Sequence, residues 1–560
     1  IKPHLVLIRL MTLVFNANLN RSDHLLKIIT QFVETGLAAL AKDALVHPYA
    51  RLARFELIKF SFIVLNTHRQ LQLRLVNRLT TLMFDALLAW FKKRAAFPFG
   101  GNLLKIKADY ALLKEVSKMI YSLQVPNYQS LVEKKSILTY FFDDEISKIA
   151  VWLNPLNPSS SRGNEIDDIS SLTIMHAYRI DPGLAIALSL RYKVKNLDEL
   201  LQKLISENPV PALKYPDAVQ FLIGINAKEI MPTYHLLFWE ALSPIDAITL
   251  FLPPFESNPF ILQYTMRSLE SSDVNLAFFY VPQIVQLLRF DKKGYVERYI
   301  LETAHVLQLF AHQIIWNMLA NLYRDEEATD PDDLKPVLDK IQSLMIKSFS
   351  PRDKKIYERE FTFFGEVTDI LGKLKPYIKK LKAEKKVKID EEMAKIEILP
   401  DVYLPLNPDG VVIDIGRKLG KPLQSHAKAP FMATFKIRKG DPTLGWVDQW
   451  QLAIITVGDD CRQDVLILQL VAVFRAIWER AGVDLYVFPN RVTATAPGCG
   501  VIDVLPNSVL RDMLGREAVN GLYAYFISKF GPALLKEFPA ARLNFVRSLA
   551  AYRILLYLLN

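Results

Sequence analysis

The sequence predicts a multidomain protein in which an α-solenoid and a helical accessory domain are followed by a smaller α+β domain. Three observations support this fold class. Apolar residues recur at three- and four-residue spacing through the first half of the chain, as in stacked amphipathic helices. A linker rich in proline, asparagine and serine interrupts this pattern at residues 154–161. After Leu399 the pattern changes to short β-like runs separated by turn residues.

Length and composition limit the class of protein. The chain has 560 residues, 51% of them hydrophobic and 23% charged, which is enough for several globular domains. Its two cysteines, Cys461 and Cys499, cannot form a disulfide framework, so a reducing compartment is expected. No apolar run approaches the roughly 20 residues that cross a bilayer, and no signal peptide is recognisable. Because the first residue is not methionine, we expect a piece of a longer chain.

The net charge of +10 indicates a polyanionic partner, either nucleic acid or an anionic membrane face. Zinc-ligand spacing, an aromatic RNA-recognition motif and a basic region with heptads are all absent from the sequence. These absences disfavour nucleic acid, so no nucleic-acid partner is predicted.

The first two regions are predicted to be helical. Residues 1–153 are expected to be the end of a solenoid, with a loop at residues 97–101 and early helices at Leu5–Phe15, Leu25–Ala41, Leu52–Asn66 and Leu71–Phe91. Residues 164–345 are expected to form the helical accessory domain. There the run Val281–Val285 recurs in type at Ala311–Ile315, 30 residues on, which favours stacked helix pairs. The alternative is two unrelated core helices of similar composition.

Residues 346–398 are predicted to be a lysine-rich helical linker. Its segment Lys373–Lys388 holds eight lysines and one acid, Glu384. Such runs are usually solvated faces, but lysines near a membrane are also attracted to an anionic leaflet. The apolar side of the run suits either lipid or a neighbouring domain, and consists of Leu374, Tyr377, Ile378 and Leu381.

Residues 399–560 are predicted to form the α+β domain. The expected strands are Val411–Ile415, Phe431–Ile437, Gln451–Val457, Leu485–Phe488 and Gly500–Leu505. The expected helices are 464–479, 520–530 and 541–559.

The charged segment Gly458–Asp464, GDDCRQD, separates an apolar strand from a long apolar helix. Asp460 is a suitable N-cap, and Gln463 stands at the capping-box position three residues later. Because the helix is apolar on all sides, it is expected to be mostly buried, and Gly482 to end it. A capped core helix explains the cap but leaves the remaining charges of the segment unexplained.

Two further segments suit a nucleotide. Gln424–Pro430 combines small residues, a hydroxyl and a lysine, which can direct N–H groups and a cation at a phosphate. Ala496–Pro506 is a turn followed by a β run, whose edge can bind an adenine through one carbonyl and one N–H. An ordinary connection and an ordinary strand would look the same.

Together these segments resemble the phosphatidylinositol 3-/4-kinase superfamily, in the same order, over Leu404–Asn560. Residues 164–323 resemble its helical accessory domain. Within the family, the runs QSHAKAPFMATFK, VGDDCRQD and TATAPGCGVIDVLPNS are most similar to type III alpha phosphatidylinositol 4-kinases. The resemblance implies a kinase-like domain, of which the N-lobe and the start of the C-lobe are present.

The resemblance implies a lipid kinase that uses ATP and Mg2+ to phosphorylate the 4-position of phosphatidylinositol. It places Ser425, His426 and Lys428 at the phosphates and Asp464 in the inner pocket. It also places the adenine hinge at Ile502, Asp503, Val504 and Leu505, where the Asp503 carbonyl and the Leu505 N–H bind the base.

The chain departs from the family pattern at three points. Thr456 replaces the ATP-contacting lysine, for which Lys428 or Lys436 are the candidate substitutes, and Asn490 replaces a pocket tyrosine. The catalytic base, metal-binding aspartate and activation loop are expected beyond Asn560, so no catalytic or metal residue is assigned and this chain alone is not expected to catalyse. The alternative function is a catalytically inactive kinase-like scaffold that binds partners at a membrane.

The family resemblance also implies the surroundings of the protein. Its expected partners are phosphatidylinositol in an anionic membrane, an adaptor and a lipid-anchored scaffold protein. Its expected location is cytoplasmic, peripherally associated with the plasma membrane. A protein kinase of the same superfamily and a nucleic-acid-binding solenoid are weaker alternatives.

Overall fold

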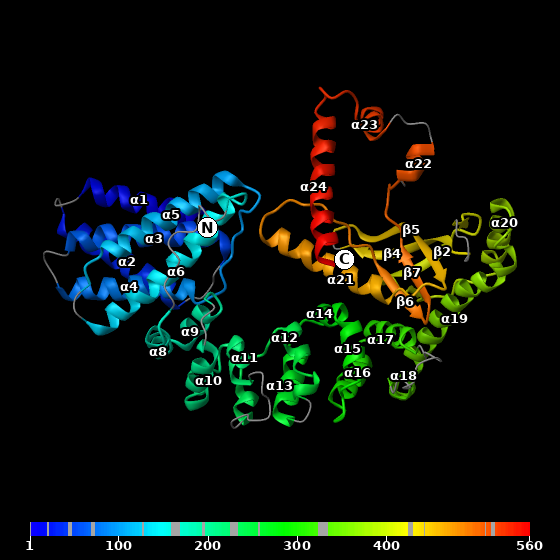
Figure 1. The fold of residues 1–560 in the computed structure, drawn as a ribbon, viewed down its shortest axis with the longest axis horizontal. Coiled ribbons are helices and arrows are strands. Elements are labelled where there is room, and N and C mark those ends of the chain that lie inside the picture. Colours follow the sequence, from blue (N-terminus) through cyan, green and yellow to red (C-terminus); the bar gives the residue numbers. More distant parts are fainter. Residues whose placement is uncertain are drawn as a thin grey trace. The chain divides into compact units, whose positions relative to one another are not determined.

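The computed structural model describes residues 2–18, 22–42, 47–68, 73–125, 128–157, 169–192, 196–223, 233–255, 258–322, 334–423, 429–441, 443–509, 511–516 and 521–559. The chain forms two compact units, residues 1–240 with 477–484 and residues 241–476 with 485–560. The predicted fold class is confirmed, since helices fill most of the chain and a curled sheet follows them toward its C-terminal end (Figure 1). Within the described residues, no helix combines the length and apolar character needed to cross a bilayer.

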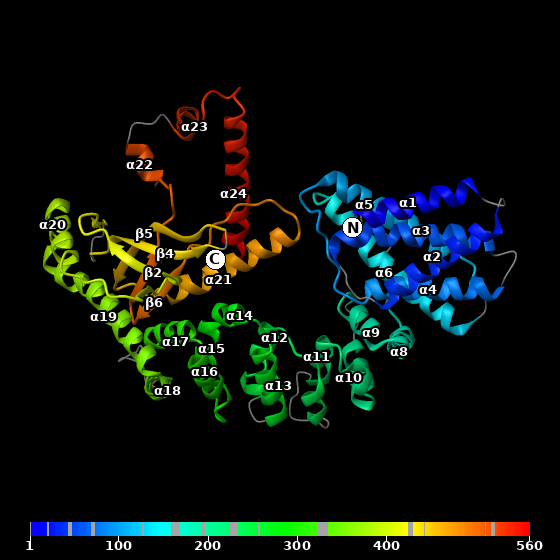
Figure 2. The same ribbon diagram turned by 180° about the vertical axis from the view of Figure 1, so that it is seen from behind.

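The first unit is built from paired helices, seen in blue to green in Figure 2. The four helices predicted before residue 92 are all present, and α1 packs on α3 as α2 packs on α4. The helices of this unit are α1 Lys2–Ala17, α2 Asp23–Lys42, α3 Arg51–His68, α4 Leu73–Phe91, α5 Leu103–Ser122, α6 Gln129–Leu153, α8 Ser171–Ile180, α9 Pro182–Ser189, α10 Leu197–Glu207 and α11 Val219–Ile223.

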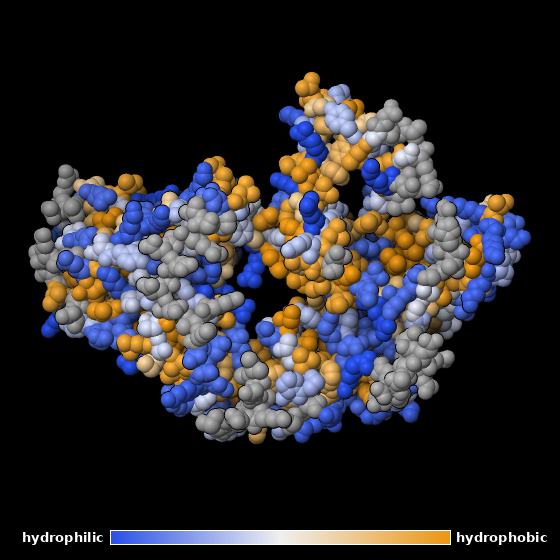
Figure 3. All heavy atoms as spheres, in the orientation of Figure 1, coloured by the Kyte–Doolittle hydropathy of each residue, from blue (hydrophilic) through white to orange (hydrophobic). Residues whose placement is uncertain are grey.

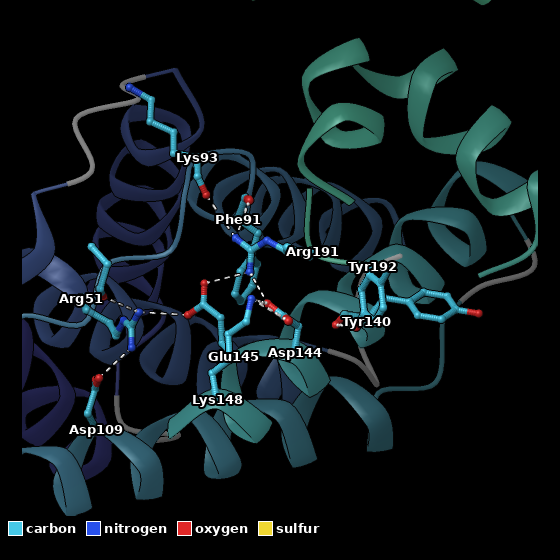
Figure 4. Close-up of polar contacts among 11 residues, drawn as sticks. Arg51, Phe91, Lys93, Asp109, Tyr140, Asp144, Glu145, Lys148, Arg191 and Tyr192 are labelled. Carbon is cyan, nitrogen blue, oxygen red and sulfur yellow. Dashed lines mark hydrogen bonds and ion pairs between the residues drawn. The ribbon is translucent and has the colours of Figure 1, made fainter. Parts of the chain in front are cut away.

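A buried ion network joins several of these helices (Figure 4). Glu145 on α6 lies between two arginines, 2.9 Å from Arg51 Nη2 and 3.2 Å from Arg191 Nη1. Arg51 also pairs with Asp109 at 2.6 Å, and Arg191 pairs with Asp144 at 3.1 Å. The side chains of Arg51 and Glu145 are only 3% and 1% exposed, so each charge depends on its partners rather than on water.

Most helices in the helical part of the second unit share one core, while α19 and α20 bury apolar residues in the core of the sheet. The similar runs at residues 281–285 and 311–315 lie on α15 and α17, which pack together and bury Ile284 and Ile314 in the shared core. Stacked helix pairs and two unrelated core helices would both give this packing, so the repeat stays a prediction. The helices are α12 Pro244–Thr249, α13 Pro259–Glu270, α14 Val274–Phe279, α15 Val281–Leu287, α16 Tyr295–Val306, α17 Gln308–Ala320, α18 Leu334–Ser348, α19 Pro351–Leu374 and α20 Lys382–Met393.

Part of the lysine-rich segment is structural. On α20, Ile389 and Met393 are buried in the core that continues into the sheet. The almost buried carboxylate of Glu392 accepts hydrogen bonds from Lys373, Lys388 and Lys395 at 2.7–2.8 Å. These bonds lower the pKa of Glu392 from 4.5 to about 2.

The sheet is antiparallel and has the order β1-β2-β4-β5-β7-β6, with β3 paired to β4. Phe431 and Phe435 of β4 and Val501 of β7 are fully buried on the face that packs toward α19. The strands are β1 Tyr403–Leu404, β2 Asn407–Ile415, β3 Lys421–Pro422, β4 Phe431–Asp441, β5 Gly445–Val457, β6 Val492–Ala496 and β7 Cys499–Asp503.

The strand predicted at Leu485–Phe488 is wrong. The segment pairs with no strand, and the Phe488 N–H donates to the Tyr552 hydroxyl at 3.2 Å instead of to a ladder carbonyl. The edge strand is β6, which starts four residues after Phe488 in a threonine- and alanine-rich stretch with a weaker apolar signal. The strands β1 and β3 were also missed, because two-residue strands have no readable period.

The last helices are α21 Arg462–Arg480, α22 Arg511–Arg516, α23 Leu522–Phe530 and α24 Glu537–Leu559. The expectation that α21 is mostly buried is wrong, because only Val471 of this helix is buried and Leu466, Val473 and Ile477 are exposed. An apolar composition favours burial but cannot supply the neighbouring elements that would cover each face.

Candidate nucleotide-binding site

The register of β5 and β7 places predicted site residues on one face of the sheet. Ile454 lies opposite Ile502, and Thr456 lies opposite Gly500. Because side chains on paired positions share a face, Ile454, Thr456 and Ile502 line the same surface. The hinge segment that follows β7 and the charged turn that follows β5 thus border this face of the sheet.

The charged turn is held by backbone bonds to the β6–β7 turn. Gly458 adopts a φ of 93°, which favours glycine, and its N–H donates to the Gly498 carbonyl at 2.6 Å. The N–H of Asp459 donates to the same carbonyl at 3.1 Å. Thr456, which is 4% exposed, donates from its hydroxyl to Asp459 Oδ2 at 2.8 Å. The turn therefore brings the Asp459 carboxylate directly beside Thr456.

Cys461 packs over the middle of β7. A Cβ atom on Gly500 would lie 2.5 Å from the Cys461 sulfur, so the close approach requires glycine at this position. Burial, followed by the carboxylates of Asp464, Asp459 and Asp460, raises the pKa of the Cys461 thiol to about 11. The thiol is therefore neutral near pH 7 and acts as a small apolar group.

The carboxylate of Asp460 is hydrogen-bonded to Arg462. It accepts the Arg462 main-chain N–H at 3.1 Å and the guanidinium at 2.7–3.1 Å, and these bonds lower the pKa of Asp460. The N-cap position is Cys461, whose carbonyl accepts the Val465 N–H at 3.1 Å, so the prediction that Asp460 is the N-cap is wrong by one residue. The predicted capping box with Gln463 is not formed; Gln463 instead lines a pocket of about 540 Å³ with Gln283 and Asn321.

Side-chain amides connect the accessory helices to the sheet domain. Gln283 of α15 exchanges hydrogen bonds of 2.9 and 3.2 Å with Gln469 of α21. Gln313, the matching residue of the repeat, donates to the Pro405 carbonyl at 3.0 Å. Arg462 donates to the side-chain amide oxygen of Asn321, the residue that caps the end of α17, at 3.4 Å. The accessory helices therefore fix the start of α21 and, through it, the charged turn.

The predicted hinge presents the polar groups that an adenine requires. The Asp503 carbonyl accepts the Asn490 side-chain amide at 3.3 Å and keeps a second lone pair. The Val504 N–H donates to Leu452, whereas the exposed Leu505 N–H has no hydrogen-bond partner in the part of the chain that the structure describes. Asn490 thus contacts the predicted hinge from the side through its amide.

A closed ring of hydrogen bonds lies behind the hinge. The Asp503 N–H donates to the Arg491 carbonyl at 2.8 Å, and Arg491 Nη1 donates to Asn407 Oδ1 at 2.8 Å. Asn407 Nδ2 donates to Gln451 at 2.6 Å, and Gln451 Nε2 returns to Asp503 Oδ1 at 3.2 Å. Sequence reasoning missed this ring, since its members are up to 96 residues apart and no local pattern connects them.

Two other predicted residues, Asp464 and Lys436, are located by the helix and the strand that carry them. Asp464 lies exposed in the first turn of α21, three residues after Cys461. Lys436 lies opposite Trp450, six residues along β5 from Thr456, and pairs with Asp448 at 3.6 Å. Six strand residues span about 20 Å, which is far beyond the reach of a lysine side chain. Lys436 therefore cannot replace the charge missing at Thr456.

Ser425, His426 and Lys428 lie outside the described residues. Their roles at the phosphates stay predictions. Among the residues with described positions, no three carboxylate, histidine or cysteine groups gather as a metal ion requires. The described part of the site thus supplies a strand edge with a carbonyl and an N–H, and an acidic turn, but not a Mg2+ cage.

Two family models match the chain. The accessory domain of the phosphoinositide 3-kinase family matches residues 177–358, and the phosphatidylinositol 3- and 4-kinase model matches residues 450–560, which contain the charged turn and the hinge. The chain belongs to the phosphatidylinositol 3- and 4-kinase family.

Similar members of this kinase family come from fungi and plants. The chain is 52% identical over its whole length to phosphatidylinositol 4-kinase STT4 of Saccharomyces cerevisiae, covering 30% of that relative. It is 43% identical over its whole length to phosphatidylinositol 4-kinase stt4 of Schizosaccharomyces pombe, covering 32%. It is 32% identical over 78% of its length to phosphatidylinositol 4-kinase alpha 1 of Arabidopsis thaliana, covering 22%. The chain thus spans less than a third of each relative.

Proposed function

We propose that the chain is the accessory and ATP-binding part of a lipid kinase that transfers the γ-phosphate of ATP to the 4-hydroxyl of phosphatidylinositol. The proposal rests on one observation. A hinge with an available carbonyl and N–H borders the same sheet face as the charged turn, in a chain 52% identical to a phosphatidylinositol 4-kinase over its whole length.

In this proposal the hinge binds the adenine. The Asp503 carbonyl accepts from the exocyclic amine, the Leu505 N–H donates to the ring, and Ile454 and Ile502 contact one face of the ring. Lys428 supplies charge to the phosphates, and Asp464 lines the inner pocket. Mg2+, when bound, would neutralise phosphate charge, but no step is assigned to it because the described residues do not form its site.

The alternative function is an inactive kinase-like scaffold, and Thr456 favours it. The buried Thr456 hydroxyl donates its hydrogen bond to Asp459, and neither side chain carries a positive charge. This position therefore offers no cation to the phosphates. Phosphoryl transfer depends chiefly on positioning and charge neutralisation, and losing a cation here weakens both. In the scaffold alternative the hinge keeps its shape, while turnover is absent.

A chimera separates the two functions. This chain replaces the matching residues of the budding-yeast relative, and formation of phosphatidylinositol 4-phosphate is measured on phosphatidylinositol vesicles. Turnover by the unaltered chimera supports the lipid-kinase proposal. Turnover that appears only after Thr456→Lys supports the scaffold. A folded chimera that is inactive in both forms contradicts the kinase proposal.

The substrate, partners and location are proposed from the same family resemblance. We propose phosphatidylinositol in an anionic membrane as substrate, with an adaptor and a lipid-anchored scaffold protein as partners. The proposed location is the cytoplasmic face of the plasma membrane.

A further inference from the structure

A turn between α19 and α20 concentrates positive charge on the second unit. We call it the lysine corner; it consists of Lys375, Lys379, Lys380, Leu381 and Lys382. Figure 3 shows the surface around α20 as mostly hydrophilic with a small apolar area. All five side chains are exposed.

The lysines of this region divide into two groups. Lys373 and Lys388 are committed to Glu392, and Lys386 pairs with Asp390 at 2.5 Å. By contrast, Lys379, Lys380 and Lys382 form no ion pair with any carboxylate whose position the structure describes. Folding of the described part therefore uses the first group and leaves the second group available for an external anion.

The acid closest in sequence does not neutralise the corner through an ion pair. The carboxylate of Glu384 accepts the Leu381 main-chain N–H at 3.2 Å, at the start of α20. This contact resembles half of a capping box, in which an acidic side chain satisfies a donor that the helix leaves free. It also fixes the backbone of Leu381 between lysines on either side.

Leu381 has no folding role visible in the structure. Its side chain is 75% exposed, as is that of Val387 at 58%, whereas Ile389 and Met393 of α20 are buried. An exposed leucine among lysines combines the two features that attract a protein to an anionic leaflet, an apolar group that enters the interface and cations that meet the headgroups.

The corner is rigidly connected to the strand that precedes the predicted phosphate loop. Gly420, next to β3, donates its N–H to Asp390 of α20 at 3.2 Å, and a Cβ atom there would lie 2.4 Å from Ile389. Lys386 donates to the Lys418 carbonyl at 3.0 Å. A contact made by the corner would therefore orient β3 relative to the surface that is contacted.

We propose that the lysine corner is a binding surface for an anionic lipid leaflet, with Leu381 entering the interface and Lys379, Lys380 and Lys382 meeting the headgroups. The proposal adds to the proposed lipid-kinase function a surface that holds the nucleotide-binding domain at the membrane. The binding itself does not require turnover.

Vesicle sedimentation tests the proposal on the full 560-residue chain without ATP. Vesicles of phosphatidylcholine are compared with vesicles of phosphatidylcholine and phosphatidylserine. The triple variant Lys379→Gln, Lys380→Gln, Lys382→Gln should bind the anionic vesicles about a hundredfold more weakly, because each lysine near the surface contributes roughly a fivefold factor. Leu381→Ser should weaken binding about tenfold.

Matched controls decide between outcomes. Lys335→Gln, Lys347→Gln and Lys354→Gln remove the same charge from exposed sites on α18 and α19 and should leave vesicle binding within about twofold. Equal loss in both triple variants would overturn the proposal in favour of net charge alone. If Leu381→Ser binds normally while the corner triple variant loses binding, the proposal of a lipid leaflet is overturned. The corner would then be a site for a soluble polyanion or an acidic protein. Unaltered melting temperatures confirm that every variant is folded.

The outcome is independent of the proposed enzymatic function. A chain that sediments as proposed but whose chimera makes no phosphatidylinositol 4-phosphate would retain the membrane surface and lose the kinase assignment. An active chimera whose corner variants sediment normally would retain the kinase assignment and lose the membrane surface.

Discussion

The hydroxyl of Thr456 donates a 2.8 Å hydrogen bond to the carboxylate of Asp459. This pair closes the end of β5 with a neutral donor, at the position where the resemblance predicts a lysine. The carboxylate thereby has a local partner, and under the proposed function the phosphates receive no positive charge from residue 456. The consequence for nucleotide binding can be measured directly.

We predict that Thr456→Lys raises the affinity of the chain for ATP about tenfold, because a charge-assisted contact to phosphate is worth roughly 1.5–3 kcal/mol before the cost of ordering the lysine. Calorimetry with ATP and with adenosine measures the effect. The gain should be confined to ATP, since adenosine carries no phosphate. Equal ATP affinities would show that Thr456 is not a defect.

Lys436→Gln provides the control for that experiment. Lys436 lies about 20 Å along the strand from Thr456 and pairs with Asp448, so its loss should leave ATP affinity within about twofold. A large loss of ATP affinity in Lys436→Gln would contradict the register argument.

We predict that Asn407→Ala weakens binding of adenosine and ATP equally, by about threefold to tenfold. The substitution opens the hydrogen-bond ring that holds Asp503, and one such bond contributes about 1 kcal/mol. Calorimetry gives both affinities, and thermal melting separates a moved hinge from a general loss of stability. Asp409→Asn, which alters only the exposed contacts of Asp409 with Arg491 and Lys439, should change neither affinity by more than about twofold. A loss confined to ATP would place the effect at the phosphates.

Sequence patterns predicted the long elements well and the short ones poorly. The helices before residue 92 and the two central strands follow from sustained periodicity, since a period of 3.6 or 2 repeats enough times to be read. The strand expected at Leu485–Phe488 failed because four apolar residues carry no information about whether a ladder partner is available. The prediction that α21 is mostly buried failed for a related reason, because composition does not show which elements will pack against a helix.

The candidate site also has a part that the sequence predicted and a part that it missed. The hinge and the charged turn were predicted because each is a contiguous segment, and the resemblance fixes their order. The ring through Asn407 and Arg491, and the contact of Gln313 with Pro405, join residues about 80 to 90 positions apart, so only the folded chain brings them together.

The buried ion network of the first unit should contribute strongly to its stability. We predict that Glu145→Ala lowers the free energy of unfolding by about 3–5 kcal/mol, because Arg51 and Arg191 would keep their buried charges with one carboxylate removed. Denaturant unfolding measures the change. Arg94→Ala breaks an exposed pair with Asp217 and should cost less than about 1 kcal/mol. Similar losses in the two variants would indicate that the network is solvated.

The Glu392 cluster should make stability depend on pH in the acid range. The three lysines lower the pKa of Glu392 from 4.5 to about 2, so the ionised form is favoured by folding. Its stabilisation is therefore complete above pH 4.5 and is lost as the pH falls toward 2. We predict that the melting temperature of Glu392→Gln lies below that of the unaltered chain at pH 6, and that the difference shrinks as the pH falls through this range. Lys395→Gln, which removes one partner and keeps the carboxylate, should show the same trend with a smaller amplitude. A difference that is constant with pH would mean that the cluster stabilises the fold by packing and not by charge.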